Sequence, residues 1–164
     1  MPEYARRSAR VLLVDGGERL LLLRTLVRPG EPSAGHVWLT PGGGVEDGES
    51  APRAAARELR EEVGLTVTAD DLTWVASTSG HADLGWIEGF FRDDFFVHRV
   101  HLHTVDTAGL EEVERLHHAG HRWWSVEELR ATDDVVYPLD LAELLTDVLA
   151  GRVFDAPVVL PWHH

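Results

Sequence analysis

Three carboxylates stand close together in the 164-residue sequence, at Glu58, Glu61 and Glu62. On a helix, spacings of three and four residues place them on one face. Carboxylates this close repel one another, and a divalent cation turns that repulsion into attraction. All-oxygen ligands suit hard ions such as Mg²⁺ or Mn²⁺. The alternative is a solvated face on which Arg57 pairs with Glu61, and the acidic cluster taken alone favours that alternative.

A glycine-rich turn precedes the cluster, with the sequence Pro-Gly-Gly-Gly at residues 41–44. Its flexible backbone can approach a phosphate or a metal closely. Ser50 is a suitable N-cap for a following helix, and Gly64 supplies its end. The free N–H groups at the start of that helix favour anions.

The spacing of these residues resembles the Nudix box, G-x5-E-x7-R-E-U-x-E-E-x-G-U, in which U is apolar. Residues 43–65 match it at every defined position, and a chance match has a probability on the order of 10⁻⁸ per start position. This resemblance reverses the preference and favours a metal site over a solvated face. The seven fixed identities are Gly43, Glu49, Arg57, Glu58, Glu61, Glu62 and Gly64.

The resemblance implies an α/β fold of the αβα sandwich type, with a mixed β-sheet between helices. It also implies hydrolysis of a nucleoside diphosphate linked to another group X, which includes (deoxy)nucleoside triphosphates. Glu61 and Glu62 would bind the metal, Glu58 would be a ligand or a general base, and the Gly42 carbonyl would be a further ligand. Mg²⁺ or Mn²⁺ is the implied cofactor, and a small nucleotide diphosphate is the implied substrate.

The same resemblance assigns supporting roles within the box. Arg57 would orient the carboxylates through charged hydrogen bonds. Glu49 would brace the loop against Arg57 or the helix, and Gly43 would permit the turn. An intact box argues against one alternative, a nucleotide-sensing module without turnover. A hydrolase of a non-nucleotide diphosphate stays open as a second alternative.

Candidate functional residues also lie outside the box. Family enzymes often take a further acidic ligand or base from another loop, and residues 109–120 supply candidates. A solvated acidic helix is an equal interpretation of that segment. Arginines before the glycine turn are candidates for phosphate contacts, and aromatic residues after the box are candidates for stacking on a base. These candidates are Glu111, Glu112 and Glu114 for the acid, and Arg24, Arg28, Trp86 and Phe90 for the substrate.

Histidines give weaker signals. His117, His118 and His121 are spaced for zinc on a helix, but surface histidines are the preferred interpretation because no cysteine accompanies them. His101 and His103 would share one face of a predicted strand over residues 95–105. We assign no role to the terminal His163 and His164.

Composition sets outer limits on the protein class. The net charge of −13 opposes binding to a nucleic acid duplex or an anionic membrane. The absence of cysteine excludes disulfides and thiolate metal sites. No apolar run approaches the roughly 20 residues that span a bilayer. We expect a cytoplasmic protein with a single domain over residues 1–164; homodimers are common in this family and among soluble proteins.

Hydrophobic patterns predict the elements that must position these residues. A strand, a tight turn and a second strand begin the chain, and the box helix follows a short third strand. Capping-box residues at Ser125 indicate a late helix. The predicted strands cover residues 11–14, 20–23, 37–39, 72–79, 85–91 and 95–105, with a turn at 92–94, and then 123–124; helices follow Ser50 and Ser125 and cover 140–149.

Overall fold

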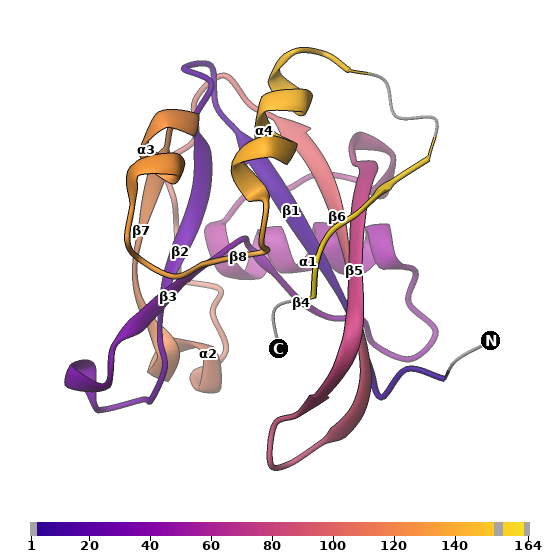
Figure 1. The fold of residues 1–164 in the computed structure, drawn as a ribbon, viewed down its shortest axis with the longest axis vertical. Helices are drawn as coiled ribbons and strands as arrows, with labels where there is room; N and C mark the ends of the chain where they lie inside the picture. Colours follow the sequence, from indigo (N-terminus) through magenta and orange to yellow (C-terminus); the bar gives the residue numbers. More distant parts are fainter. Residues whose placement is uncertain (1–2, 153–155, 163–164) are drawn as a thin grey trace.

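The computed structural model describes residues 3–152 and 156–162, so His163 and His164 lie outside the described part. Its strands form one mixed sheet in the order β8-β3-β2-β1-β6-β5-β9, to which β4 is added beside β1 and β7 beside β2 (Figure 1). The strands are β1 Arg6–Val14, β2 Leu20–Leu26, β3 His36–Leu39, β4 Gly42–Gly44, β5 Thr73–Asp83, β6 Glu88–Arg99, β7 His118–Trp124, β8 Val136–Tyr137 and β9 Val158–Val159. The helices are α1 Ala51–Val63, α2 Glu112–His117, α3 Val126–Ala131 and α4 Leu141–Leu149, with 3-10 turns at Pro32–Ala34 and Ala69–Asp71.

Helices α1 and α4 lie on opposite faces of the sheet (Figure 1). Successive side chains of a strand point to opposite faces, and β1 shows this alternation within the core. Val11 and Leu13 pack in the cluster that contains Leu59 of α1. Leu12 packs in the other cluster, with Leu145 of α4. Two apolar layers therefore enclose the sheet, which confirms the predicted αβα arrangement.

The box helix begins and ends where the sequence predicts. The Ser50 side chain accepts a hydrogen bond from the Arg53 backbone N–H at 3.3 Å, which caps α1. Gly64 ends the helix in the left-handed conformation, with φ 74°. The buried face of α1 includes Leu59 and Val63, so packing against β1 fixes the rotation of the helix.

The predicted turn at residues 92–94 is wrong, because β6 runs through these residues from Glu88 to Arg99. Arg92, Asp93 and Asp94, the charged residues that suggested a turn, lie inside the sheet instead. Arg7 of the neighbouring strand donates to Asp94 at 3.3 Å, and Arg92 donates to the same carboxylate at 3.1 Å. The chain reverses instead at residues 84–87, where the Leu84 N–H donates to the Ile87 carbonyl.

The predicted strand over residues 95–105 is too long, since β6 ends at Arg99. Its partner β1 ends at Val14, and the parallel pairing stops at the pair Val14–Arg99. His101 and His103 therefore do not share a strand face, which corrects that prediction. His103 Nε2 lies 2.7 Å from the Val63 carbonyl oxygen at the end of α1.

The acidic segment 109–120 contains the short helix α2, and strand β7 begins near its end, at His118. Trp123 and Trp124 belong to β7, as predicted, and Trp124 is fully buried. Ser125 caps α3 with a complete capping box. Among the helices of the described residues, none has the length and apolar content needed to cross a membrane.

Candidate active site

Strand β4 lets the box helix approach the sheet very closely. A Cβ on Gly43 would lie 2.5 Å from Oε1 of Glu58, so a side chain at this position would displace that carboxylate. The neighbouring Gly42 N–H donates to Oε2 of Glu62 at 2.9 Å. The absence of a side chain at Gly43 therefore leaves room for the Glu58 carboxylate in its observed position.

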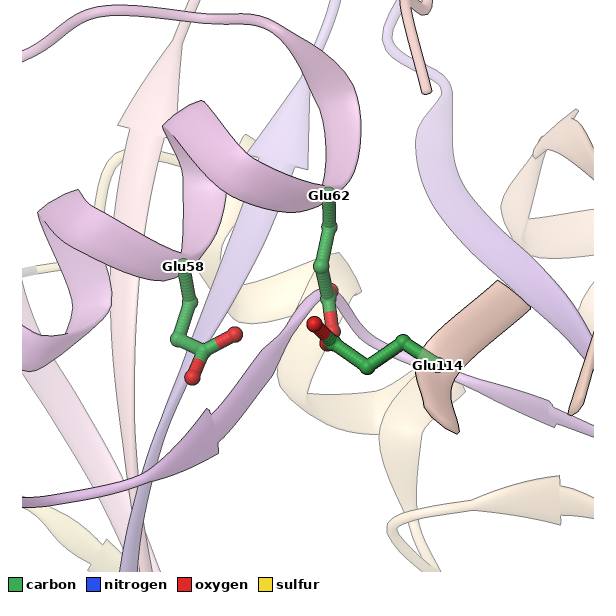
Figure 2. A group of neighbouring side chains, drawn as sticks. All are labelled: Glu58, Glu62 and Glu114. Carbon is green, nitrogen blue, oxygen red and sulfur yellow. The ribbon is translucent and has the colours of Figure 1, made fainter. Parts of the chain in front are cut away.

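Three carboxylates converge beside this strand. Glu58 and Glu62 come from one face of α1, and Glu114 comes from α2 (Figure 2). Each offers an oxygen atom, and these atoms all lie within 4.8 Å of one another. Of the three acids predicted outside the box, the structure brings only Glu114 to this group; Glu111 caps the N-terminus of α2, and Glu112 is exposed.

Burial makes this cluster electrostatically costly without a cation. Burial raises the pKa of Glu58 to about 7, against the opposing effect of Arg57. Burial, and then the charge of Glu58, raise the pKa of Glu62 well above its ordinary value. Oε2 of Glu58 is buried and has no hydrogen-bond partner among the described residues. A buried, unpartnered oxygen among converging hard ligands fits a divalent cation.

Arg57 holds the carboxylates of the box in place. Its Nε and Nη2 donate to the two oxygens of Glu49, each at 2.9 Å, and Nη2 also donates to the Gly44 carbonyl at 2.9 Å. Its Nη1 donates to Glu58 at 3.0 Å and to Glu61 at 3.3 Å. Hydrogen bonding to Arg57 lowers the pKa of Glu49. Glu61 therefore lies against Arg57 and outside the group of three converging carboxylates.

A cavity of about 190 Å³ opens beside the cluster. Glu62, Glu114 and Gly42 line it together with Arg10 of β1 and Thr40. The sequence analysis missed Arg10; its signal was an arginine directly before the apolar run Val11–Val14, where it extends strand β1. A larger cavity of about 520 Å³ lies between α3 and α4, and its lining contains none of the three carboxylates.

The two arginines predicted to contact phosphate lie away from this cavity. Arg24 is on β2, and its Nη2 lies 3.3 Å from Nδ1 of His36. Its strand neighbour Thr25 lines the cavity, whereas Arg24 is not among the lining residues. Arg28 is 71% exposed and pairs with Glu31 at 3.8 Å.

The two aromatic candidates lie at the end of the β5–β6 hairpin. Trp86 is 69% exposed, and its ring lies 5.7 Å from the guanidinium of Arg6. Phe90 is half exposed and packs edge-on against His81. Neither residue lines the cavity beside Glu62.

Two of the histidines considered for zinc lie on the cavity wall. His117 and His118 line it, and Nδ1 of His117 lies 3.2 Å from the Leu26 carbonyl oxygen. Burial lowers the pKa of His118. Within residues 3–152 and 156–162, the one group of three or more side chains placed to hold a metal is the glutamate cluster, so the histidines form no such group.

Comparisons with known proteins agree with this geometry. The family described as "NUDIX domain" matches residues 5–143. An RNA pyrophosphohydrolase of Teredinibacter turnerae is 41% identical over 75 residues, which is 46% of this chain and 39% of the relative. A dihydroneopterin triphosphate diphosphatase of Escherichia coli is 38% identical over 70 residues, 43% of this chain and 45% of the relative. Each match thus spans less than half of the relative's length.

Solved structures share the fold along most of the chain. The E. coli dihydroneopterin triphosphate pyrophosphohydrolase has a TM-score of 0.62 and 20% identity, covering 89% of this chain and 96% of its own. A protein of Methanosarcina mazei has a TM-score of 0.61 and 20% identity, covering 89% of this chain and 94% of its own. At these identities the likeness concerns the fold, and the family match over residues 5–143 adds the box. This chain belongs to the Nudix family.

Proposed function

We propose that the protein hydrolyses the diphosphate linkage of a nucleoside diphosphate joined to another group, such as a (deoxy)nucleoside triphosphate. The observation that carries the proposal is the convergence of Glu58, Glu62 and Glu114 beside a glycine strand in a Nudix chain. Two relatives that match 46% and 43% of this chain bear the names RNA pyrophosphohydrolase and dihydroneopterin triphosphate diphosphatase. The products would be a nucleoside monophosphate and a phosphorylated X, or pyrophosphate from a triphosphate.

The three converging carboxylates would hold Mg²⁺ or Mn²⁺. The Gly42 carbonyl and Glu61 are the further ligands that the box resemblance predicts. A bound divalent ion supplies neutralisation of the diphosphate charge and a lowered pKa of bound water.

The remaining chemistry belongs to side chains of this chain. Arg57 fixes the rotamer of Glu58 through the 3.0 Å hydrogen bond to Oε1, and this leaves Oε2 directed away from the guanidinium. Oε2 of Glu58 is therefore placed either to bind the cation or to accept a proton from the attacking water. Glu49 receives two hydrogen bonds from Arg57 and keeps that guanidinium from moving.

A substrate screen tests the proposal. Nucleoside di- and triphosphates, nucleotide sugars, ADP-ribose and non-nucleotide diphosphates are incubated with Mg²⁺ or Mn²⁺, and phosphate is measured after coupling to a phosphatase. We expect turnover of a nucleotide diphosphate that a double Glu61→Gln, Glu62→Gln variant loses. Turnover of only non-nucleotide substrates, or nucleotide binding without turnover, would replace the proposal by one of the two alternatives. Unchanged turnover in the double variant would refute the assignment of the site.

Two further predictions concern the whole protein. We infer a cytoplasmic location, in keeping with a small nucleotide substrate. The homodimer stays a prediction, which size-exclusion chromatography with light scattering tests directly.

A further inference from the structure

Strand β4 consists of three glycines and separates two sets of charged side chains. Glu58 lies against Gly43 on the side of α1. On the other side, a Cβ on Gly42 would meet β1, at the Ala9 carbonyl oxygen and at 2.6 Å from Cα and Cγ of Arg10. Two residues further on, a Cβ on Gly44 would lie 3.3 Å from Nη2 of Arg6. The backbone of β4 is thus a thin partition with carboxylates on one side and arginines on the other.

The pairing of β4 with β1 explains this arrangement. Arg10 is the register partner of Gly42, and Ser8 is the register partner of Gly44. Residues Arg6, Ser8 and Arg10 alternate along β1, so they share the sheet face opposite to α1. Among the described residues β4 pairs with β1 alone, and side chains of α1 bond to its second edge: the Gly42 N–H donates to Glu62, and the Gly44 carbonyl accepts from Arg57. A ligand in the cavity that Arg10 shares with Glu62 and Glu114 can contact both sides of the partition.

Arg10 borders the cavity in which the two sides meet. The lining of the 190 Å³ cavity includes Arg10 together with Glu62 and Glu114. Arg10 also borders two adjoining cavities, one of about 120 Å³ beside Arg6 and Asp93 and one of about 40 Å³. Its Nη1 donates to the Thr40 carbonyl at 3.0 Å, which anchors one of the five N–H groups of the guanidinium.

Charge gives a reason for arginines at this position. The chain carries a net charge of −13 and three converging carboxylates, which repel a polyphosphate. Burial, and then the charge of Arg10, lower the pKa of Arg6, so the two guanidinium groups lie within electrostatic range of each other. The carboxyl group of Asp93 interacts with both guanidinium groups, and it is one acid for two cations. A phosphate beside Arg10 would add a second anion, and the planar guanidinium matches phosphate geometry.

We propose that Arg10 binds a phosphate group of the substrate in the cavity that it shares with Glu62 and Glu114, and that Arg6 supports the same phosphate chain from the adjoining cavity. This inference rests on the proposed hydrolase function and names a residue that contacts its substrate. Arg10 holds the phosphate chain in place while the carboxylate side carries the chemistry.

The test compares Arg10→Met, Arg10→Lys and Arg6→Met with the wild-type protein. Arg152→Met is the control, because Arg152 is exposed and pairs with Asp147 at 3.5 Å near the end of α4. Steady-state kinetics use the nucleotide that the wild type hydrolyses best. Isothermal titration calorimetry measures binding of inorganic pyrophosphate in the presence of Mg²⁺, and thermal melting followed by circular dichroism reports the fold.

For Arg10→Met we expect KM and the pyrophosphate dissociation constant to rise about ten- to a hundredfold, the range of hydrogen bonds to charged groups. We expect kcat to change by less than about threefold. Arg10→Lys should fall between Arg10→Met and the wild type, because a lysine restores the charge without the planar fork. Arg6→Met should raise KM by a smaller factor, and Arg152→Met should match the wild type.

The outcomes separate this inference from the proposed function. A wild-type enzyme that turns over nucleotides while Arg10→Met keeps KM and pyrophosphate affinity within about twofold refutes the role of Arg10 and leaves the function intact. A lowered melting temperature with unchanged KM in Arg10→Lys also refutes it, because Arg10 would then only anchor Thr40. If the wild type binds pyrophosphate but turns over no nucleotide, the hydrolase function is refuted. If Arg10→Met then loses pyrophosphate binding, the phosphate site is still supported.

Discussion

The metal-free protein should lose stability as the pH rises, because α1 buries carboxylates that must ionise. Glu58 has an ordinary pKa of 4.5 and a folded-state pKa of about 7, which burial raises. Between these values the folded protein binds more protons than the unfolded chain, so the free energy of unfolding falls with increasing pH. The difference corresponds to about 3 kcal/mol for this one group.

Other titrating groups adjust this figure. Burial raises the pKa values of Glu62 and Asp93, and both changes act in the same direction as that of Glu58. Burial lowers the pKa of the half-buried His118, which acts in the opposite direction at acid pH. We therefore expect a net loss of a few kcal/mol between about pH 5 and pH 8.

Urea unfolding followed by tryptophan fluorescence measures the effect in buffers treated with a chelator. Addition of millimolar Mg²⁺ at pH 8 should restore stability, because a cation binds the ionised carboxylates of the folded state alone. Glu58→Gln should flatten the pH dependence, whereas Glu127→Gln, at an exposed position of α3, should retain it. A metal-free stability that stays constant or rises from pH 5 to pH 8, or an undiminished slope in Glu58→Gln, would refute the reasoning.

Three further outcomes follow from the site and its helix. Glu114→Gln should lower kcat/KM about ten- to a hundredfold, while Glu112→Gln on the exposed side of α2 should leave it within about twofold; equal effects would contradict the assignment. Arg57→Lys should weaken Mg²⁺ binding about ten- to a hundredfold in calorimetry, because lysine cannot make the two-point contact with Glu49. Gly64→Ala should lower the free energy of unfolding in urea by about 1 kcal/mol or more, because φ is 74° and the added Cβ would lie 2.7 Å from Cβ of Asp106. A more stable variant would exclude this strain.

Local signals in the sequence predicted the box helix α1 well. A capping serine, an apolar stripe and a terminal glycine are short-range features, and α1 begins after Ser50 and ends at Gly64 as they indicate. The box spacing likewise determined the family, which the match over residues 5–143 confirms. The αβα layers are those that the family resemblance implied.

The errors concern partners that are distant in the sequence. Residues 92–94 look like a turn because two aspartates follow an arginine, yet Arg7, 87 residues from Asp94, pairs with that carboxylate within the sheet. The strand after them ends at Arg99 because its partner β1 ends at Val14. A strand's length depends on the chain beside it, and the local sequence carries no record of that partner.

The sequence by itself determined the helix and the carboxylates at three- and four-residue spacing. The turn predicted at residues 41–44 is wrong, because Gly42–Gly44 pair with β1 as strand β4. Only the tertiary structure selected Glu114 from three neighbouring acids, placed Glu61 against Arg57 and brought Arg10 of β1 to the edge of the cavity. Helical spacing is a property of one segment, whereas these juxtapositions depend on how α2, β4 and β1 pack together. Sheet pairing and core packing are cooperative, and they decide which of several similar side chains meet.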